Sequence, residues 1–246
     1  MRTDPDAERH ETRTWSARRR AALGVRGLRV VEPRFPPPRV NRVLRKVSGA
    51  VRDFVFEREL ETSGTYIAPE HFHSERALYE PSGWFYLRRA LRSRDVRPGD
   101  VFVDFGSGKG RIVYQAARYP FARVIGVEIS EHLNEVARLN IERNRQRLVR
   151  KDVELVTMDA AEFRIPDEMT HAYFYYPFGG ETFRRVLDNI VESLDRTPRR
   201  LTLIYACPGQ EDPIRETGRF ELVRRSRGGL TSYLPRTIAV YESRST

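Results

Sequence analysis

Cysteine is nearly absent from this sequence, and that absence limits what the protein can be. Cys207 is the single cysteine among 246 residues, so a disulfide within one chain is excluded and a thiolate metal site is disfavoured. No apolar run reaches the roughly 18 residues of a membrane-spanning helix. The start of the chain also lacks the basic segment and apolar stretch of a signal peptide. We therefore expect a reduced, cytoplasmic protein with no membrane partner.

Lysine is also scarce, although the chain is strongly basic. Of its 44 basic residues 41 are arginine, and the net charge is +10. Residues 1–46 hold thirteen basic residues against five acids, so +8 of the net charge lies there. A basic tail before a nearly neutral domain is typical of weak contact with a polyanion such as nucleic acid. An arginine-rich composition inherited from a GC-rich genome is the alternative explanation.

The rest of the chain is organised around residues 101–113. This stretch begins as a β-branched apolar run, breaks at Gly106, Gly108 and Gly110, and then resumes with helical periodicity. A strand, a glycine turn and a helix form the first unit of a nucleotide-binding α/β sheet. The start of the helix offers unpaired N–H groups and the positive end of a dipole.

The glycine spacing separates the ligands that such a turn can hold. Dinucleotide sites use Gly-x-Gly-x-x-Gly, and a Walker loop needs a Gly-Lys-Ser/Thr ending that Lys109 does not have. Here the pattern is Gly-x-Gly-x-Gly, and Asp104 stands two residues before it. A carboxylate would repel a pyrophosphate, but it suits a cation such as the amino group of S-adenosylmethionine (SAM). An NAD-dependent dehydrogenase is the alternative that this spacing disfavours.

Two further apolar runs each end in an acid. Residues 124–128 end at Glu128, about 20 residues after the first glycine, where a carboxylate accepts from a ribose diol. Residues 153–160 contain Asp159, placed to meet an adenine amine. The alternative is that both acids are solvated strand ends.

Strands that alternate with helices predict an α/β fold. We expect a Rossmann-like, mostly parallel seven-stranded sheet with an antiparallel closing hairpin, plus an N-terminal helical extension. Three parts are predicted: a disordered basic tail at 1–38, a helical extension and cofactor lid at 39–95, and a catalytic core at 96–246. The extension includes an amphipathic helix within 40–55 and a second helix that runs from Pro81 to Arg94.

Over about residues 79–243 the sequence resembles the class I SAM-dependent methyltransferases. The stretch from Asp104 to Arg111, together with 126–130, is most similar to bacterial relatives of the non-SET histone-lysine methyltransferases, the disruptor-of-telomeric-silencing family. The segment 79–82 is similar to a Tyr-x-Pro-Thr segment of those proteins. The resemblance implies SAM as the cofactor and the following contacts with it: Asp104, Gly106, Ser107, Gly108, Gly110, Glu128, Ile129, Asp159, Ala160, Tyr79 and Tyr176.

The resemblance places methyl transfer at the end of the fourth core strand, where Tyr176-Pro177-Phe178 stands. Many of the relatives carry Asn-Pro-Phe there, so this chain replaces an amide with a phenol. Tyr176 is the predicted catalytic residue, orienting an amine or a hydroxyl, and Phe178 a pocket wall. The alternative is that Tyr176 only packs. Cys207 follows the fifth strand, which argues against a cytosine-C5 mechanism.

We expect no metal, because His71, His73 and Glu75 alone are a weak pattern and methyl transfer needs none. The favoured acceptor is a nitrogen, on a protein lysine by resemblance. A natural-product small molecule is the closest alternative, followed by nucleic acid and by a SAM-binding module without turnover. The oligomeric state is not fixed by the sequence.

Overall fold

The computed structural model describes residues 60–62, 66–67, 78–149, 152–175, 178–226 and 237–244, with the backbone alone for 66–67 and 78–79. Several predicted features lie outside these residues: the tail at 1–38, the helix within 40–55, most of the lid including His71, His73 and Glu75, and Tyr176.

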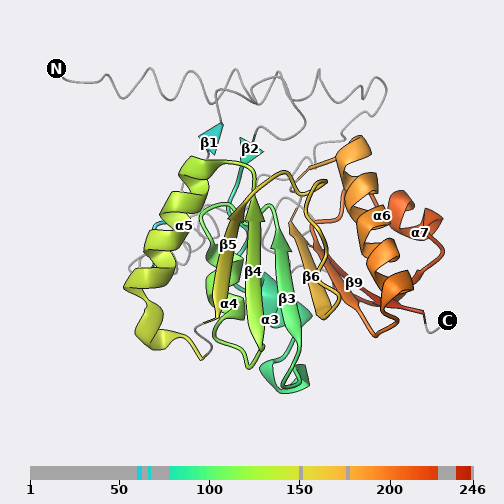
Figure 1. Ribbon diagram of the computed structural model, residues 1–246, viewed down its shortest axis with the longest axis horizontal. Coiled ribbons are helices and arrows are strands. Elements are labelled where there is room, and N and C mark those ends of the chain that lie inside the picture. Colours follow the sequence, from blue (N-terminus) through green and yellow to red (C-terminus); the bar gives the residue numbers. More distant parts are fainter. Residues whose placement is uncertain are drawn as a thin grey trace, which may run out of the picture. The chain divides into compact units, whose positions relative to one another are not determined.

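A seven-stranded sheet forms the centre of the described fold (Figure 1). Its strand order is β5-β4-β3-β6-β7-β9-β8. The first five of these run parallel to one another, whereas β9 runs antiparallel to both β7 and β8. The bounds are Val101–Phe105 for β3, Arg123–Glu128 for β4, Val153–Thr157 for β5, Met169–Tyr175 for β6, Thr202–Ala206 for β7, Phe220–Ser226 for β8 and Ile238–Ser243 for β9. The predicted sheet, with its antiparallel closing pair, is confirmed.

The strand order reverses direction at β3, which lies between β4 and β6. Asp104 pairs in register with Gly126 on one side and with Tyr173 on the other. Ligands of open α/β sheets bind beyond the carboxyl ends of the strands at such a switch point. The fold therefore places the site at the ends of β3, β4, β5 and β6.

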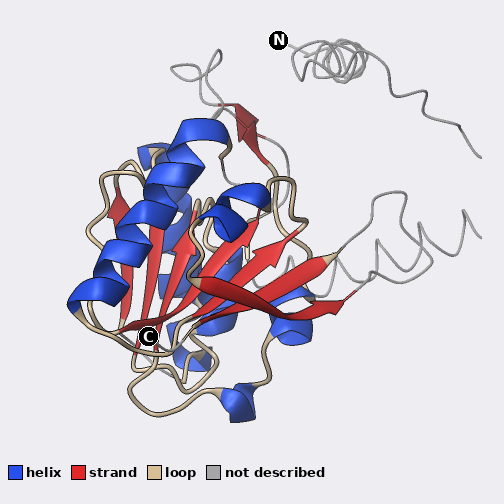
Figure 2. Cartoon of the chain, turned by 90° about the vertical axis from the view of Figure 1, so that its right-hand side faces the viewer, coloured by secondary structure: helices blue, strands red, loops and turns tan. Residues whose placement is uncertain are grey.

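Helices cover both faces of the sheet (Figure 2). They are α3 (Tyr86–Ala90), α4 (Arg111–Ala116), α5 (Glu131–Arg143), α6 (Gly180–Arg196) and α7 (Asp212–Glu216). Because side chains alternate along a strand, Val103 and Phe105 pack in one core cluster with residues of α6, whereas Phe102 packs in the other with residues of α3 and α4. Asp104 follows the same alternation and shares the face of Phe102.

A small second sheet precedes this core. Its strands β1 (Tyr66–Ile67) and β2 (Leu78–Tyr79) pair antiparallel, with Tyr66 opposite Tyr79. In Figure 1 they lie beyond the carboxyl ends of the central strands.

The helix predicted from Pro81 to Arg94 was wrong in its length. The structure has a helix only over Tyr86–Ala90, and Leu91 after it is extended. The carbonyl of Ser82 accepts a hydrogen bond from Arg111 at 2.8 Å, so the chain before Gly83 follows a tertiary contact instead of a helical ladder. The short helix α7 was not predicted.

No helix among the described residues is both long enough and apolar enough to cross a membrane.

His171 is a buried titratable group in the first half of β6, away from the carboxyl ends of the parallel strands. Its ring lies edge-on to Phe121, with 5.1 Å between centroids, and its Nδ1 is 2.9 Å from Thr170 Oγ1. Burial lowers the pKa of His171 to about 4, with the nearby charges of Asp100, Arg200 and Glu242 as smaller influences. The folded state therefore holds this imidazole neutral.

This burial predicts an acid-labile fold. Because folding lowers the pKa of His171, the fold has its full stability above about pH 6.5. As the pH drops from there toward 4, the unfolded state binds a proton that the folded state does not, so stability falls. Between pH 7 and pH 5 the free energy of unfolding should fall by about 2 kcal/mol from this residue. Urea unfolding at the two pH values measures it. A His171→Gln variant that loses as much stability as the wild type on acidification would contradict this assignment.

Candidate cofactor and methyl-transfer site

The glycine loop after β3 folds back onto β4. Gly106, Gly108 and Gly110 have φ values of 77°, 53° and 79°, a left-handed conformation that other residues rarely adopt. The N–H groups of Gly106 and Ser107 both donate to the carbonyl of Val127, at 2.8 and 3.0 Å. The alternate glycines therefore form a tight turn directly against the neighbouring strand.

The last glycine of the loop also permits close helix packing. Gly110 caps α4, and a Cβ added to it would lie 3.0 Å from the Cβ of Ala137 on α5. Beneath the loop, a Cβ added to Gly126 would lie 2.8 Å from the Oγ of Ser107. The buried side chain of Ser107 thus faces β4.

Glu128, the last residue of β4, bonds directly to this loop. Its Oε2 accepts from the N–H of Gly108 at 2.8 Å, and its Oε1 accepts from the N–H of Ser130 at 3.0 Å. The side chain is buried. The structure therefore brings together the glycine loop and the acid predicted to hold a ribose, although they are twenty residues apart in sequence.

Asp104 is a second buried acid at the same edge. Only 3% of its surface is exposed. Burial raises the pKa of Asp104 well above its usual value, and the negative charge of Glu128 raises this pKa further. Two acids that share a desolvated space favour a cationic ligand, since a positive group would relieve both the burial and the repulsion. These two carboxylates fit the amino group and the sulfonium of SAM, and they would repel a pyrophosphate.

Asp159 follows β5 in a turn of its own. Its Oδ1 accepts from the N–H of Ala161 at 3.0 Å, and its carbonyl accepts from Glu162 at 2.9 Å. The end of β5 is tied to β4, because Met158 N–H donates to the carbonyl of Glu128 at 3.0 Å. The three predicted acids therefore stand on neighbouring strand ends.

Three apolar residues stand beside these acids. Ala160 is buried, and Ile129 is half-buried directly after Glu128. Met158, directly after β5, exposes 39% of its surface although it is a large apolar side chain. The sequence analysis did not single out Met158, because a methionine in an apolar run gives no signal of exposure.

The end of β6 is described up to Tyr175 and again from Phe178. Phe178 is half-buried, with its ring 6.4 Å from that of Phe174 and 6.3 Å from that of Phe183. Its packing fits the expected wall better than a direct chemical role. On the other face of the sheet the ring of Tyr175 lies 5.7 Å from that of Tyr86. Tyr79 is described by its backbone in β2, and the predicted contact of its side chain stays a prediction.

Two other residues near the loop were missed. Arg111, directly after Gly110, is buried, and its guanidinium lies 4.4 Å from the centroid of the Trp84 ring. Asn140 on α5 is 1% exposed and donates to the carbonyl of Lys109 at 3.0 Å. Basic and amide residues usually mark solvated positions, so neither stood out in an arginine-rich sequence.

The part of the chain that is described contains no group of three or more His, Cys, Asp or Glu arranged to hold a metal ion.

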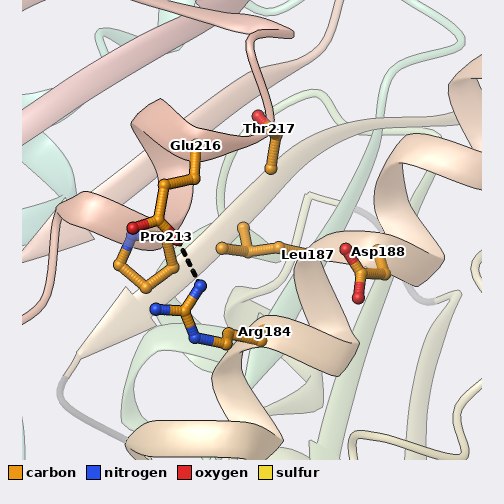
Figure 3. A pocket seen from close by; sticks show the side chains of 6 residues that line it. All are labelled: Arg184, Leu187, Asp188, Pro213, Glu216 and Thr217. Atoms are coloured by element: carbon orange, nitrogen blue, oxygen red, sulfur yellow. Dashed lines mark hydrogen bonds and ion pairs between the residues drawn. The ribbon is translucent and has the colours of Figure 1, made fainter.

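A hollow between α6 and α7 lies apart from the predicted site residues (Figure 3). An ion pair between Arg184 and Glu216 crosses it, and it is lined by these two with Leu187, Asp188, Pro213 and Thr217. None of the predicted site residues lines it.

Comparison with known proteins supports this description. Residues 82–171 match the family model described as histone methylation protein DOT1. That range contains the glycine loop and all three acids. No curated protein matches the chain.

Several solved structures are similar to the chain. An RNA methyltransferase from Salinibacter ruber, in complex with S-adenosyl-L-homocysteine, is 26% identical, with 67% of this chain and 92% of that chain covered and a TM-score of 0.48. Magnesium protoporphyrin IX methyltransferase from Synechocystis PCC 6803 with bound SAM is 19% identical, with 60% and 71% covered and a TM-score of 0.46. Ribosomal protein L11 methylase from Lactobacillus delbrueckii subsp. bulgaricus is 19% identical, with 66% and 76% covered and a TM-score of 0.46.

The sheet order, the glycine loop with its buried acids, and the family match define a class I SAM-dependent methyltransferase. Within that class, residues 82–171 are similar to the DOT1 family.

Replacing Glu128 tests its part in cofactor binding. Glu128→Ala removes the acceptor expected for the ribose and also the acceptor of the Gly108 N–H. Charge-assisted hydrogen bonds of this kind contribute on the order of 2–4 kcal/mol together, so SAM affinity should fall at least about tenfold. Calorimetric titration measures the affinity, and Glu154→Ala, which removes a half-exposed acid of β5, is the control. Unchanged affinity in a folded Glu128→Ala protein would remove the assignment.

The raised pKa of Asp104 leads us to expect that the affinity for SAM depends on pH. Burial and the charge of Glu128 raise the pKa of Asp104 in the free protein, and an ammonium ligand beside the carboxylate would lower this pKa again. Binding should therefore release protons and strengthen as the pH rises, until it levels off above that raised pKa. Titrations in two buffers of different ionisation enthalpy count the protons. Asp104→Asn should bind more weakly and lose this linkage, whereas a wild type that releases no protons would contradict the contact.

Proposed function

We propose that this protein transfers a methyl group from SAM to a nitrogen nucleophile, the side-chain amine of a protein lysine. The observation that carries the proposal is the match of residues 82–171 to a family described by histone methylation. That match covers the segment in which the glycine loop, Asp104, Glu128 and Asp159 stand, so the similarity lies where the cofactor would be held.

The proposed division of labour follows the strand ends. Asp104 and the turn at Gly106, Gly108 and Gly110 hold the methionine end of SAM, Glu128 the ribose, and Asp159 with the backbone of Ala160 the adenine edge. The bound cofactor supplies an electrophilic methyl on a sulfonium, and transfer is an in-line displacement. The protein must align the nucleophile with that methyl and exclude water.

A lysine acceptor adds one requirement, because its amine must lose a proton before it can attack. Apolar and aromatic surroundings lower the pKa of a lysine by disfavouring its charged form. The described residues at the end of β6 supply such surroundings: Tyr175 packs near Tyr86, and Phe178 packs on Phe174 and Phe183. The phenol of Tyr176, the residue after this strand, is proposed to accept a hydrogen bond from the amine and orient its lone pair.

Nucleic acid is the second acceptor that a specific observation favours. The net charge of +8 over residues 1–46 would attract a polyanion and make its binding dependent on salt. A small-molecule acceptor and a SAM-binding module without turnover stay as alternatives from the sequence, and the same experiment separates all four.

The acceptor is identified with SAM that carries a tritiated methyl group. The full chain is incubated with lysate separated into protein, RNA and small-molecule fractions. We expect label in the protein fraction and methyl-lysine after acid hydrolysis. Label in RNA or in small molecules would replace the lysine proposal. Bound SAM with no S-adenosylhomocysteine released from any fraction would indicate the module without turnover.

Tyr176→Phe tests the proposed orienting hydroxyl. If one hydrogen bond is made mainly in the transition state, turnover should fall about 10- to 100-fold while SAM affinity stays unchanged. Tyr119→Phe is the matched control, because its hydroxyl donates to the carbonyl of Leu91 at 3.2 Å, away from the site. Single-turnover rates and melting curves of both variants distinguish an orienting hydroxyl from a side chain that only packs. A Tyr176→Phe enzyme as fast as the wild type would assign Tyr176 to packing.

A further inference from the structure

The peptide group of Glu61 is held by a side chain that lies 79 residues away. The amide of Asn140, on α5, accepts from the N–H of Glu61 at 2.9 Å and donates to its carbonyl at 3.1 Å. These are the two bonds that a neighbouring strand would make. Asn140 and Leu60 are each 1% exposed, whereas Glu61 is exposed, so the contact lies where the buried core meets the surface.

The same amide reaches the cofactor loop. Asn140 Nδ2 also donates to the carbonyl of Lys109, the residue between Gly108 and Gly110, at 3.0 Å. An asparagine amide has two hydrogens and one oxygen, and all of them are used here. One buried side chain therefore joins the segment 60–62 to the loop that would hold the cofactor.

Arg111 makes a second bridge from the other end of the loop. Its Nε donates to Thr62 Oγ1 and its Nη1 donates to the carbonyl of Ser82, both at 2.8 Å. Its guanidinium also lies over the Trp84 ring. Because a guanidinium presents its donors in a rigid plane, these contacts fix Thr62 and Ser82 relative to the first turn of α4.

The residues held in this way flank the β1–β2 hairpin on both sides. Thr62 precedes β1 and Ser82 follows β2, and the two strands pair at Tyr66 and Tyr79. Figure 1 shows β1 and β2 beyond the carboxyl ends of the central strands, the edge where the cofactor site lies. Residues on both sides of the two strands are thus bonded to Arg111, the first residue of α4, and Asn140 connects Glu61 with the loop at Lys109.

We propose that Asn140 and Arg111 are positioning residues that couple cofactor binding to the docking of the β1–β2 hairpin. A ligand held beside the loop stabilises the loop conformation in which the carbonyl of Lys109 accepts from Asn140 and Arg111 holds Thr62 and Ser82. By thermodynamic reciprocity, the docked hairpin raises cofactor affinity by the same factor. The proposal rests on SAM binding and is independent of the identity of the acceptor.

Hydrogen exchange of the Glu61 amide in the full chain, with and without saturating S-adenosylhomocysteine, tests the coupling. We expect the ligand to slow this exchange about tenfold or more in the wild type, beyond any slowing of the core amide of Ile204. Asn140→Leu should abolish the slowing, and its affinity for S-adenosylhomocysteine should fall by the same factor that the wild type shows. A purely structural role would not produce equal factors in two separate measurements.

Two variants control for loss of stability. Asn134→Leu removes an equally buried amide from α5, one that donates to Thr157 Oγ1 at 2.7 Å. Arg199→Met removes an arginine that donates to the carbonyls of Met169 and Ser193, at 2.6 and 2.9 Å. Both should lower the melting temperature and keep the ligand-dependent slowing at Glu61.

Arg111→Lys is the second test variant, for the case that Asn140→Leu does not fold. It retains the positive charge but loses the planar guanidinium that donates to both Thr62 and Ser82. It should weaken the slowing at Glu61 without removing it. The proposal is overturned if the ligand does not slow Glu61 exchange in the wild type, or if Asn140→Leu retains the full response. A wild type that does not bind S-adenosylhomocysteine at all would instead overturn the cofactor assignment.

Discussion

The hydrogen bond from Gly108 N–H to Glu128 Oε2, at 2.8 Å, is the interaction on which the site depends. It joins the glycine loop after β3 to the end of β4, and the other oxygen of the same carboxylate accepts from Ser130 N–H at the start of α5. Parallel pairing of β3 with β4 makes it possible, because it brings both strand ends to one edge. The loop, the strand end and the next helix are therefore set by one buried carboxylate.

That arrangement has an electrostatic cost. Asp104 and Glu128 are both buried at the same edge, and each disfavours the charge of the other, which is reflected in the raised pKa of Asp104. Buried acids are stable when they are paired or hydrogen-bonded, and both oxygens of Glu128 accept backbone N–H groups, from Gly108 and Ser130. A cationic ligand would supply the missing positive charge. The site thus combines local stabilisation through the loop with a chemical preference for a ligand such as SAM.

Much of this fold could be predicted from periodicity and spacing. The seven strands, the glycine loop and the acids at the strand ends are local patterns, and the structure places them together as the α/β rule requires. The contacts of Asn140 with Glu61 and of Arg111 with Ser82 could not be predicted, because they join residues far apart that carry no motif. The same contacts explain the shorter α3, since local helix signals after Pro81 compete with a tertiary bond to the Ser82 carbonyl.

The central claim is that the loop and its two buried acids select a SAM-type cofactor over a dinucleotide. Calorimetric titration of the full chain with S-adenosylhomocysteine, repeated in the presence of NAD, tests it most directly. The account predicts binding of one equivalent of S-adenosylhomocysteine with an affinity that millimolar NAD does not change. Binding of NAD in its place, or competition between the two, would contradict the account.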